Sequence, residues 1–265
     1  MRKTNVVRDM LVERRLAGEV RTTRQQSLAY IERTLTGATN YTFGLADWQT
    51  ATVDELIDAT ERVAGDRLTD GDPTVGYICP DRALDGMIRH ADSLRGLLSE
   101  GGASVLLATG HPMGLLDHYA ELAAALSKAG NTVLRPLDDH ALETATPEHL
   151  AGESGIRFIC GVGCAFVDEA ILHTHQPDYM KAMLGHLKAK GQPVDLVIAD
   201  HGMAGAAIEA GITTVSIADV NDTALMLAQQ RGRHESLLCI EDNLAPAQFH
   251  PVTEFILATA SAPRS

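Results

Sequence analysis

From residue 74 onward, short runs of apolar residues alternate with longer stretches in which apolar residues recur every three or four positions. The first pattern predicts buried strands and the second predicts amphipathic helices. The predicted strands are Val75–Cys79, Ser104–Ala108, Thr132–Leu134, Ile156–Cys160, Asp195–Ala199, Thr213–Ala218 and Ser236–Ile240. The clearest helices between them are Leu115–Ala129, Asp178–Ala189 and Asp222–Gln230. This alternation predicts an α/β fold with a mostly parallel, Rossmann-like sheet and helices on both of its faces.

Before residue 74, the apolar residues recur at the spacing of an α-helix in three segments. Apolar positions recur at helical spacing within Val7–Ala17, Thr23–Leu35 and Thr52–Val63. Thr52 is expected to cap the third of these helices, with Glu55 completing a capping box. The pattern divides the chain into a helical N-terminal segment, residues 1–73, and an α/β catalytic domain, residues 74–265.

Polar side chains follow several of the predicted strands at the point where each strand ends. They are Asp200 and His201, then Asp219, Asn221 and Asp222, and finally Asp242 and Asn243. In an open parallel sheet the carboxyl ends of the strands meet at one edge, which is where ligands usually bind. We therefore expect these side chains to lie close together.

Several of these residues also have a purely structural interpretation. Asp200 can cap the helix that follows it, Asp222 or Asn221 can cap the next one, and Asp242 can belong to a turn. One helix needs only one cap, however, so the acidic and amide residues after Ala218 exceed that need. The small residues after His201, beginning with Gly202, permit close approach of the backbone to a ligand and of the helix to the sheet.

Two further segments contain candidate ligand groups. Gly110, His111 and Gly114 lie between a predicted strand and a predicted helix, where backbone amides and an imidazole can bind an anion. A tight turn is the structural alternative. His173 and His175 project to the same side of an extended segment, so both can reach one metal ion or one phosphate, unless they form a surface pair.

These side chains together suit a divalent metal ion. Carboxylate and amide oxygens favour Mg²⁺ or Mn²⁺. Direct ligation by the histidines would instead shift the preference toward Mn²⁺, Fe²⁺ or Zn²⁺. Cys160 and Cys164 lack the second pair of ligands that a closed zinc site requires.

Composition narrows the choice of partners. The chain has 265 residues, 45% of them hydrophobic, and a formal net charge of −13. This charge argues against binding to nucleic acids or anionic membranes, since both are polyanions. No run approaches the roughly 18 apolar residues of a membrane span, and the first residues lack the apolar centre of a signal peptide. We expect a cytoplasmic protein, and a homodimer by base rate.

The polar blocks in combination resemble a family of bacterial proteins, found largely in actinobacteria, that is labelled "phosphatase". The resemblance spans roughly residues 70 to 260. The blocks that carry it are Ala108–Leu116, His173–His175, Ala199–Ala207, Ala218–Asp222 and Asp242–Asn243. The resemblance implies hydrolysis of a small phosphate ester.

The phosphatase hypothesis gives each candidate residue a role. Asp200, Asp219, Asp222 and Asp242 are candidate metal ligands, with Asp200 also a candidate catalytic residue beside His111 and His201. The candidate substrate-binding residues are Gly110, Gly114, His173, His175, Asn221 and Asn243, and Arg135 and Arg157 are further candidate contacts. A metal-activated water would be the nucleophile. Two alternatives stay open: a metal-dependent hydrolase of a carbon centre such as an amide, and a non-catalytic binder of a phosphorylated metabolite.

Overall fold

The computed structural model describes residues 2–142 and 152–262. Its helices are α1 (Arg2–Glu13), α2 (Arg24–Leu35), α3 (Thr39–Thr42), α4 (Val53–Ala64), α5 (Pro80–Glu100), α6 (Pro112–Lys128), α7 (Asp178–Ala189), α8 (His201–Glu209), α9 (Thr223–Gln230) and α10 (His250–Ser261), with short 3₁₀ turns at Asp47–Thr50 and Pro246–Gln248. Its strands are β1 (Gly18–Val20), β2 (Gly76–Ile78), β3 (Ser104–Thr109), β4 (Thr132–Val133), β5 (His140–Ala141), β6 (Ser154–Ile159), β7 (Val162–Val167), β8 (Ala170–Ile171), β9 (Leu196–Asp200), β10 (Thr214–Ala218) and β11 (Ser236–Cys239).

The fold is a mixed α/β architecture built on one central sheet, as predicted in its coarse form. The sheet order is β11-β10-β9-β3-β7-β6-β5, with β4 beside β3 and β8 beside β7. Strands β11, β10, β9, β3, β4 and β7 pair in parallel. The remaining strands, β6, β5 and β8, pair antiparallel, so the sheet is mostly parallel but mixed in orientation.

The antiparallel part has a local cause in the turn between β6 and β7. Only Cys160 and Gly161 separate the two strands, and both have positive φ, 49° and 87°. Positive φ at both central residues is the geometry of a two-residue hairpin, which forces its strands to run antiparallel. The turn leaves Cys160 exposed while Cys164 is buried in β7, and Cys164 is a free thiol.

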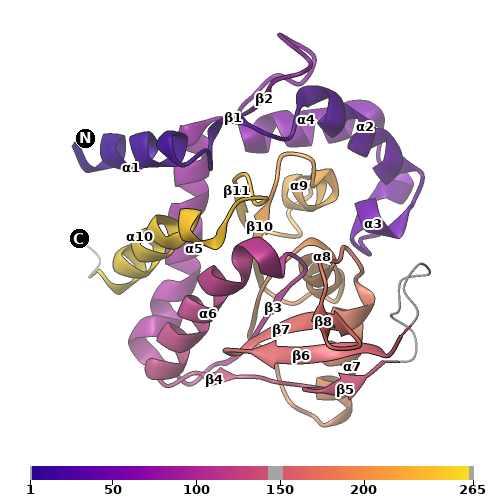
Figure 1. Cartoon of the computed structure of the whole chain (residues 1–265), viewed down its shortest axis with the longest axis vertical. Helices are drawn as coiled ribbons and strands as arrows, with labels where there is room; N and C mark the ends of the chain where they lie inside the picture. The colour runs from indigo at the N-terminus through magenta and orange to yellow at the C-terminus, as the bar shows by residue number, and fades with distance from the viewer. Residues whose placement is uncertain (1, 143–151, 263–265) are drawn as a thin grey trace.

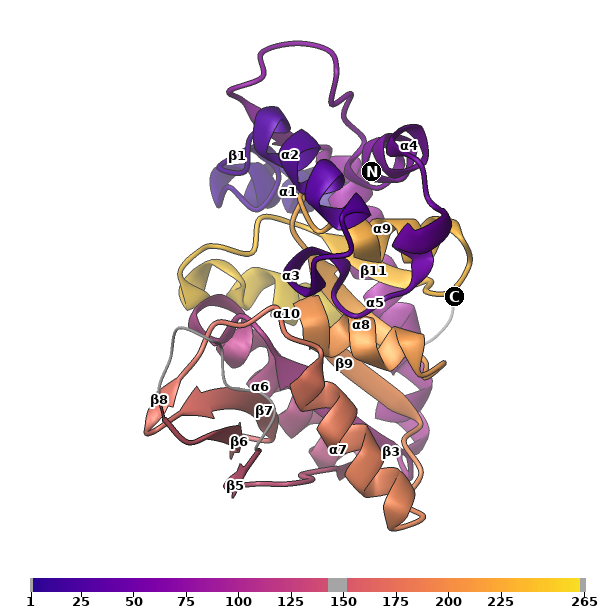
Figure 2. The ribbon, with the colours of Figure 1, turned by 90° about the vertical axis from the view of Figure 1, so that its right-hand side faces the viewer.

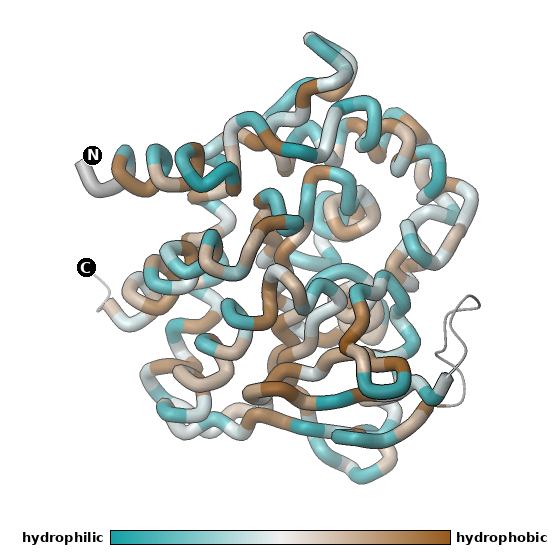
Figure 3. Tube along the Cα trace, viewed as in Figure 1, coloured by the Kyte–Doolittle hydropathy of each residue, from teal (hydrophilic) through white to brown (hydrophobic). Residues whose placement is uncertain are grey.

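Helices pack along the parallel strands. Helix α6 contacts β3 and β7, α5 contacts β11, and α8 contacts β9 and β10. Figure 1 shows α5, α6 and α10 on one side of these strands and α7, α8 and α9 on the other. Figure 3 shows apolar residues concentrated along the central strands, which agrees with the largely buried sequence of β3 and β7.

The N-terminal residues pack against the helices near β10 and β11. Strand β1 pairs antiparallel with β2, and α2 and α4 both contact α9. Figure 2 shows α2 and α4 above α9, and α3 beside α9 and above α8. A small apolar cluster joins these elements and consists of Ile31, Leu56, Leu68 and Leu227. The division into two domains stays a prediction.

Two local predictions in this region are wrong in detail. The first helix ends at Glu13, ahead of the predicted end at Ala17, because the chain turns through Arg15 at φ 59° into β1. The Thr52 side chain accepts from the Glu55 N–H as predicted, at 3.2 Å. The Glu55 carboxylate pairs with Arg231, so the reciprocal half of the predicted capping box does not form.

No helix within the described residues is long and apolar enough to span a membrane.

Candidate functional site

The candidate site lies at the carboxyl ends of four neighbouring parallel strands. In the sheet order β11-β10-β9-β3, Asp242, Asp219 and His111 follow β11, β10 and β3, and Asp200 is the last residue of β9. The register aligns Ala108 of β3 with Ala199 of β9, and Ile217 of β10 with Asp200. The strand ends that carry these polar side chains are therefore level with one another at one edge of the sheet.

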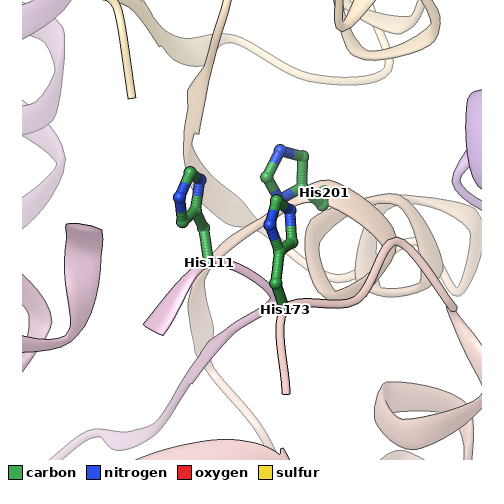
Figure 4. A group of neighbouring side chains, drawn as sticks. All are labelled: His111, His173 and His201. Atoms are coloured by element: carbon green, nitrogen blue, oxygen red, sulfur yellow. The ribbon is translucent and has the colours of Figure 1, made fainter. Parts of the chain in front are cut away.

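Four histidines form a stacked group above this edge. The rings of His111 and His173 are nearly parallel with centroids 4.4 Å apart, and those of His175 and His201 are also 4.4 Å apart. The Nε2 atoms of His173 and His175 are 3.2 Å apart. Figure 4 shows His111, His173 and His201 reaching one region from three separate segments. The predicted proximity of the two imidazoles in the His-Thr-His segment is present in the structure.

Carboxylates surround the imidazole of His201. Its Nδ1 lies 3.0 Å from Asp200 Oδ2, and its Nε2 lies 3.6 Å from Asp222 Oδ2 and 3.3 Å from Asp242 Oδ2. Asp242 also reaches His111, with Oδ1 3.5 Å from His111 Nδ1. Asp242 thus links the two histidines, and all these side chains except those of His173 and His175 are buried.

Two glycines let the His173–His175 segment approach the strand ends closely. A Cβ on Gly110 would lie 2.3 Å from the Thr174 carbonyl oxygen, and a Cβ on Gly202 would lie 2.2 Å from the His175 carbonyl oxygen. Both distances are far below any real Cβ contact. The close approach at Gly202 is to the backbone of the histidine segment, whereas the sequence suggested a ligand or the sheet. The Thr174 N–H donates to the Gly110 carbonyl at 2.8 Å, which fixes the two segments together.

The N-terminal helices complete the surroundings of the site. Thr22 donates its hydroxyl hydrogen to Asp219 Oδ2, and the Arg21 N–H donates to Glu241 Oε2 at 2.8 Å. His175 Nδ1 donates to the Asn40 carbonyl at 2.9 Å, which leaves its Nε2 free to face His173. Phe43 packs against both His175 and His201, with ring centroids 5.4 and 5.7 Å apart. Sequence reasoning missed these contacts because they join distant segments.

The carboxyl groups of the site differ in their proton affinity. Burial raises the pKa of Asp222 to about 7, against the opposing charge of His201. Burial also raises the pKa of Asp219 well above its usual value, and the charges of Asp242 and Glu241 add to it. Burial opposes ionisation of Asp242 too, but the adjacent His111 and His201 outweigh it and hold its pKa well below the usual range. Of Asp219, Asp222 and Asp242, the last is therefore the one whose surroundings favour the ionised form.

The histidines of the site also differ from one another in their proton affinity. Burial alone would lower the pKa of His201, but the surrounding carboxylates outweigh it and raise the pKa well above 6.5. Burial, together with the charge on His201, lowers the pKa of His175 to about 3 and that of His173 to about 4. His173 and His175 are therefore neutral near pH 7, the form in which an imidazole can bind a metal ion.

Several predicted residues lie at the margin of this cluster. Gly114 packs the start of α6 against the backbone of Asp242, since a Cβ there would meet the Asp242 carbonyl oxygen at 2.6 Å. Asn221 is half-buried and its carbonyl accepts from the Thr223 N–H. Asn243 is exposed, and its carbonyl accepts from Arg21. Both asparagines thus contribute backbone contacts, and the substrate-binding role of their side chains stays a prediction.

The capping alternative fails for both aspartates. Asp200 and Asp222 do precede α8 and α9, but neither side chain makes a capping hydrogen bond. Asp200 Oδ2 accepts from the Gly110 N–H at 2.9 Å, and Asp222 Oδ2 accepts from the Asp219 N–H at 2.9 Å. Asp200 therefore connects the ends of two neighbouring strands, and Asp222 fixes the segment that follows β10.

The two arginines proposed as substrate contacts are already paired. Arg135 forms an ion pair with Asp138, and Arg157 forms ion pairs with Asp139 and Glu169. Arg157 belongs to β6, in the antiparallel part of the sheet beyond β7. These pairs compensate the arginine charges locally, which leaves less positive charge to attract a substrate.

Glu241 belongs to the cluster but was not among the predicted site residues. It is 1% exposed, and one ligand oxygen from each of Glu241, Asp219 and Asp242 lies within 4.8 Å of the others. Its place directly before Asp242 was visible in the sequence, after the apolar run Ser236–Ile240. A second acidic residue at a strand end is the signal that could have identified it.

The buried ligand atoms suit a metal ion. Three overlapping groups each bring their ligand atoms within 4.8 Å of one another: His111, His173 and His201; His201, Asp222 and Asp242; and Asp219, Glu241 and Asp242. Two buried oxygens of the cluster, Asp200 Oδ1 and Glu241 Oε1, have no hydrogen-bond partner in the described residues. Buried polar atoms are normally satisfied, so unpartnered carboxylate oxygens beside neutral imidazoles fit a bound cation.

Comparison with known proteins agrees with the resemblance seen in the sequence. A family model described as "Phosphatase" matches residues 2–264. A protein named Phosphatase SCO2771, from Streptomyces coelicolor (strain ATCC BAA-471 / A3(2) / M145), is 34% identical over 259 residues, covering 94% of this chain and 93% of the relative. No solved structure matches the chain. The family match includes the N-terminal residues that approach Asp219 and Glu241, and on this basis the chain belongs to the Phosphatase family.

Proposed function

We propose that the protein is a metal-dependent phosphatase that hydrolyses a small phosphorylated metabolite. The observation that carries the proposal is the buried histidine and carboxylate cluster, whose ligand atoms form groups within 4.8 Å and which contains two buried carboxylate oxygens without a hydrogen-bond partner among the described residues. Family membership supplies the reaction class, and the donor set supports metal dependence. Mn²⁺ and Mg²⁺ suit the carboxylates, while the histidines also suit Zn²⁺ and Fe²⁺.

A bound divalent cation would neutralise charge on the phosphoryl oxygens and lower the pKa of a water molecule, so that it can act as a nucleophile at neutral pH. His201 and Asp242 are the proposed central ligands because each belongs to two of the three groups. Asp222 adds a third ligand beside them. Its pKa of about 7 means that a cation can take the place of its proton near neutral pH.

Asp200 acts in this proposal as a positioning residue. Its Oδ2 lies against His201 Nδ1 and also accepts from the Gly110 N–H. A carboxylate on the far nitrogen of a ligating histidine fixes the orientation of the ring and increases its basicity. His201 Nε2 is thereby directed toward Asp222 and Asp242.

His111 and the start of α6 are the proposed contacts of the phosphoryl group. His111 directly precedes this 17-residue helix, whose N-terminal end has a positive partial charge that favours an anion. The pKa of His111 is raised because Asp242 outweighs the opposing effect of burial, which favours the protonated form. A protonated His111 can donate to a phosphoryl oxygen or give its proton to the leaving oxygen. His173 is exposed, so substrate would enter on its side.

A substrate panel tests the reaction class. Purified protein should release inorganic phosphate from small phosphate monoesters in the presence of Mn²⁺ or Mg²⁺, and should leave small amides intact under the same conditions. The assay measures free phosphate and free amine in parallel, with Zn²⁺ as a third metal. Amide cleavage without phosphate release would favour the carbon-centre hydrolase. Binding of phosphate esters without any turnover would favour the non-catalytic binder.

A further inference from the structure

We infer that the site binds two divalent cations in chemically different subsites, with Glu241 as a ligand of the second. The inference deepens the proposed function and rests on its metal site. The first subsite is rich in nitrogen and is formed by His173 and His201, whose ligand atoms lie within 4.8 Å of each other and of His111, the proposed phosphoryl contact. The second contains only oxygen ligands and consists of Asp219, Glu241 and Asp242.

The unpartnered oxygen of Glu241 distinguishes the second subsite from an ordinary acidic cluster. Glu241 Oε2 accepts from the Arg21 N–H at 2.8 Å, whereas Oε1 is buried and has no hydrogen-bond partner in the described residues. The Arg21 contact holds the carboxylate in place. Its second oxygen is left unsatisfied within the group that Glu241 forms with Asp219 and Asp242, where a cation would satisfy it.

The charge of the whole cluster also exceeds what one cation would balance. Five acidic side chains are between 0% and 4% exposed: Asp200, Asp219, Asp222, Glu241 and Asp242. Within residues 2–142 and 152–262, no arginine or lysine side chain forms an ion pair with any of them. When all five are ionised, one divalent cation balances only two of their negative charges. Buried charges require compensation, which a second divalent cation supplies.

Asp242 is placed to serve both cations. Its Oδ2 lies 3.3 Å from His201 Nε2 in the first subsite, and one of its oxygens lies within 4.8 Å of a ligand oxygen of Asp219 and of Glu241 in the second. A carboxylate between two cations can give one oxygen to each. In two-metal phosphatases such ions lie about 3.5–4 Å apart and stabilise both the attacking and the leaving oxygen. The oxygen subsite favours Mg²⁺ or Mn²⁺, and the nitrogen-rich subsite accepts Mn²⁺, Fe²⁺ or Zn²⁺.

Metal content tests the inference independently of activity. The protein is loaded with Mn²⁺, desalted and analysed for manganese per chain. Wild type should retain two equivalents, and Glu241→Gln, which keeps the shape of the side chain, should retain one. His173→Ala, at an exposed position, should lose the other equivalent. Glu235→Gln, an exposed glutamate just before β11, is the matched control and should retain two.

The electron paramagnetic resonance spectrum provides a second readout. Two neighbouring Mn²⁺ ions should broaden the wild-type signal by spin coupling, and Glu241→Gln should restore the sharp spectrum of an isolated ion. One equivalent in wild type, or two in Glu241→Gln, would overturn the inference even if phosphate esters are hydrolysed. Two equivalents in a protein that hydrolyses no phosphate ester would instead remove the proposed function and leave the two-cation site standing.

Discussion

Replacing Asp242 by asparagine should lower kcat/KM for a phosphate ester by about 10³-fold or more, which corresponds to roughly 4 kcal/mol of transition-state stabilisation. Asp242 contacts both His111 and His201 and belongs to two of the three ligand groups. Asparagine keeps the shape but removes the charge that the cations need and that favours protonation of His111. Phosphate release from one monoester at saturating Mn²⁺ measures the effect.

The matched control for Asp242→Asn is Asp58→Asn. Asp58 is an exposed aspartate on α4 that pairs only weakly with Arg62, at 3.7 Å. Its replacement should leave both kcat and KM within about twofold of wild type, as is usual for surface substitutions. Activity in a folded Asp242→Asn variant within about tenfold of wild type would show that Asp242 is not a central ligand.

Replacing His201 should strongly reduce activity. Replacement by glycine should also relieve backbone strain at this position. His201 has φ 46°, in the left-handed region that costs a non-glycine residue about 1–2 kcal/mol. His201→Ala and His201→Gly should both reduce kcat/KM by about 10³-fold, because each removes the imidazole shared by two ligand groups. His201→Gly should nevertheless be more stable than His201→Ala by about 1 kcal/mol, since glycine adopts this conformation freely.

Chemical denaturation of the two metal-free variants measures that difference in stability. Comparing glycine with alanine at one position cancels the loss of the imidazole, so only the backbone term remains. If the two variants unfold at the same denaturant concentration, with the same dependence of unfolding free energy on denaturant, backbone strain at His201 is contradicted. Retention of activity by either variant would exclude His201 as a ligand.

The edge of the sheet is predictable from the sequence because a strand buried on both faces is a continuous apolar run. The residue that ends such a run is easy to identify, and parallel strands bring their carboxyl ends together. The apolar runs alone therefore place Asp200, Asp219 and Asp242 at one edge. His173 and His175 are recognised by their spacing, since alternate residues of an extended segment project to the same side.

The remaining parts of the site depend on contacts between distant segments, which a local pattern does not encode. Thr22 reaches Asp219, and the carbonyl of Asn40 orients His175, yet neither residue differs locally from an ordinary helix end. The β6–β7 hairpin escapes prediction for a different reason: its turn residues, Cys160 and Gly161, lack the asparagine or aspartate that usually signals such a turn.

Asp200 illustrates how structure separates roles that a sequence leaves open. A strand-end aspartate before a helix could be a cap, a ligand or a base, and all three are consistent with the sequence. Its contacts to the Gly110 N–H and to His201 Nδ1 exclude the cap and favour a positioning role. That choice depends on a neighbouring strand end 90 residues away in the chain.

Metal removal and restoration tests the central claim most directly. The purified protein is stripped with a chelator, exchanged into metal-free buffer and titrated with Mn²⁺ while phosphate release from a monoester is followed. We predict that the stripped protein has less than about 1% of the original rate, because charge stabilisation and nucleophile activation are both lost. Added Mn²⁺ should restore the rate in proportion to the bound metal. Full activity in protein shown to contain no metal would contradict a metal-dependent phosphatase at this site.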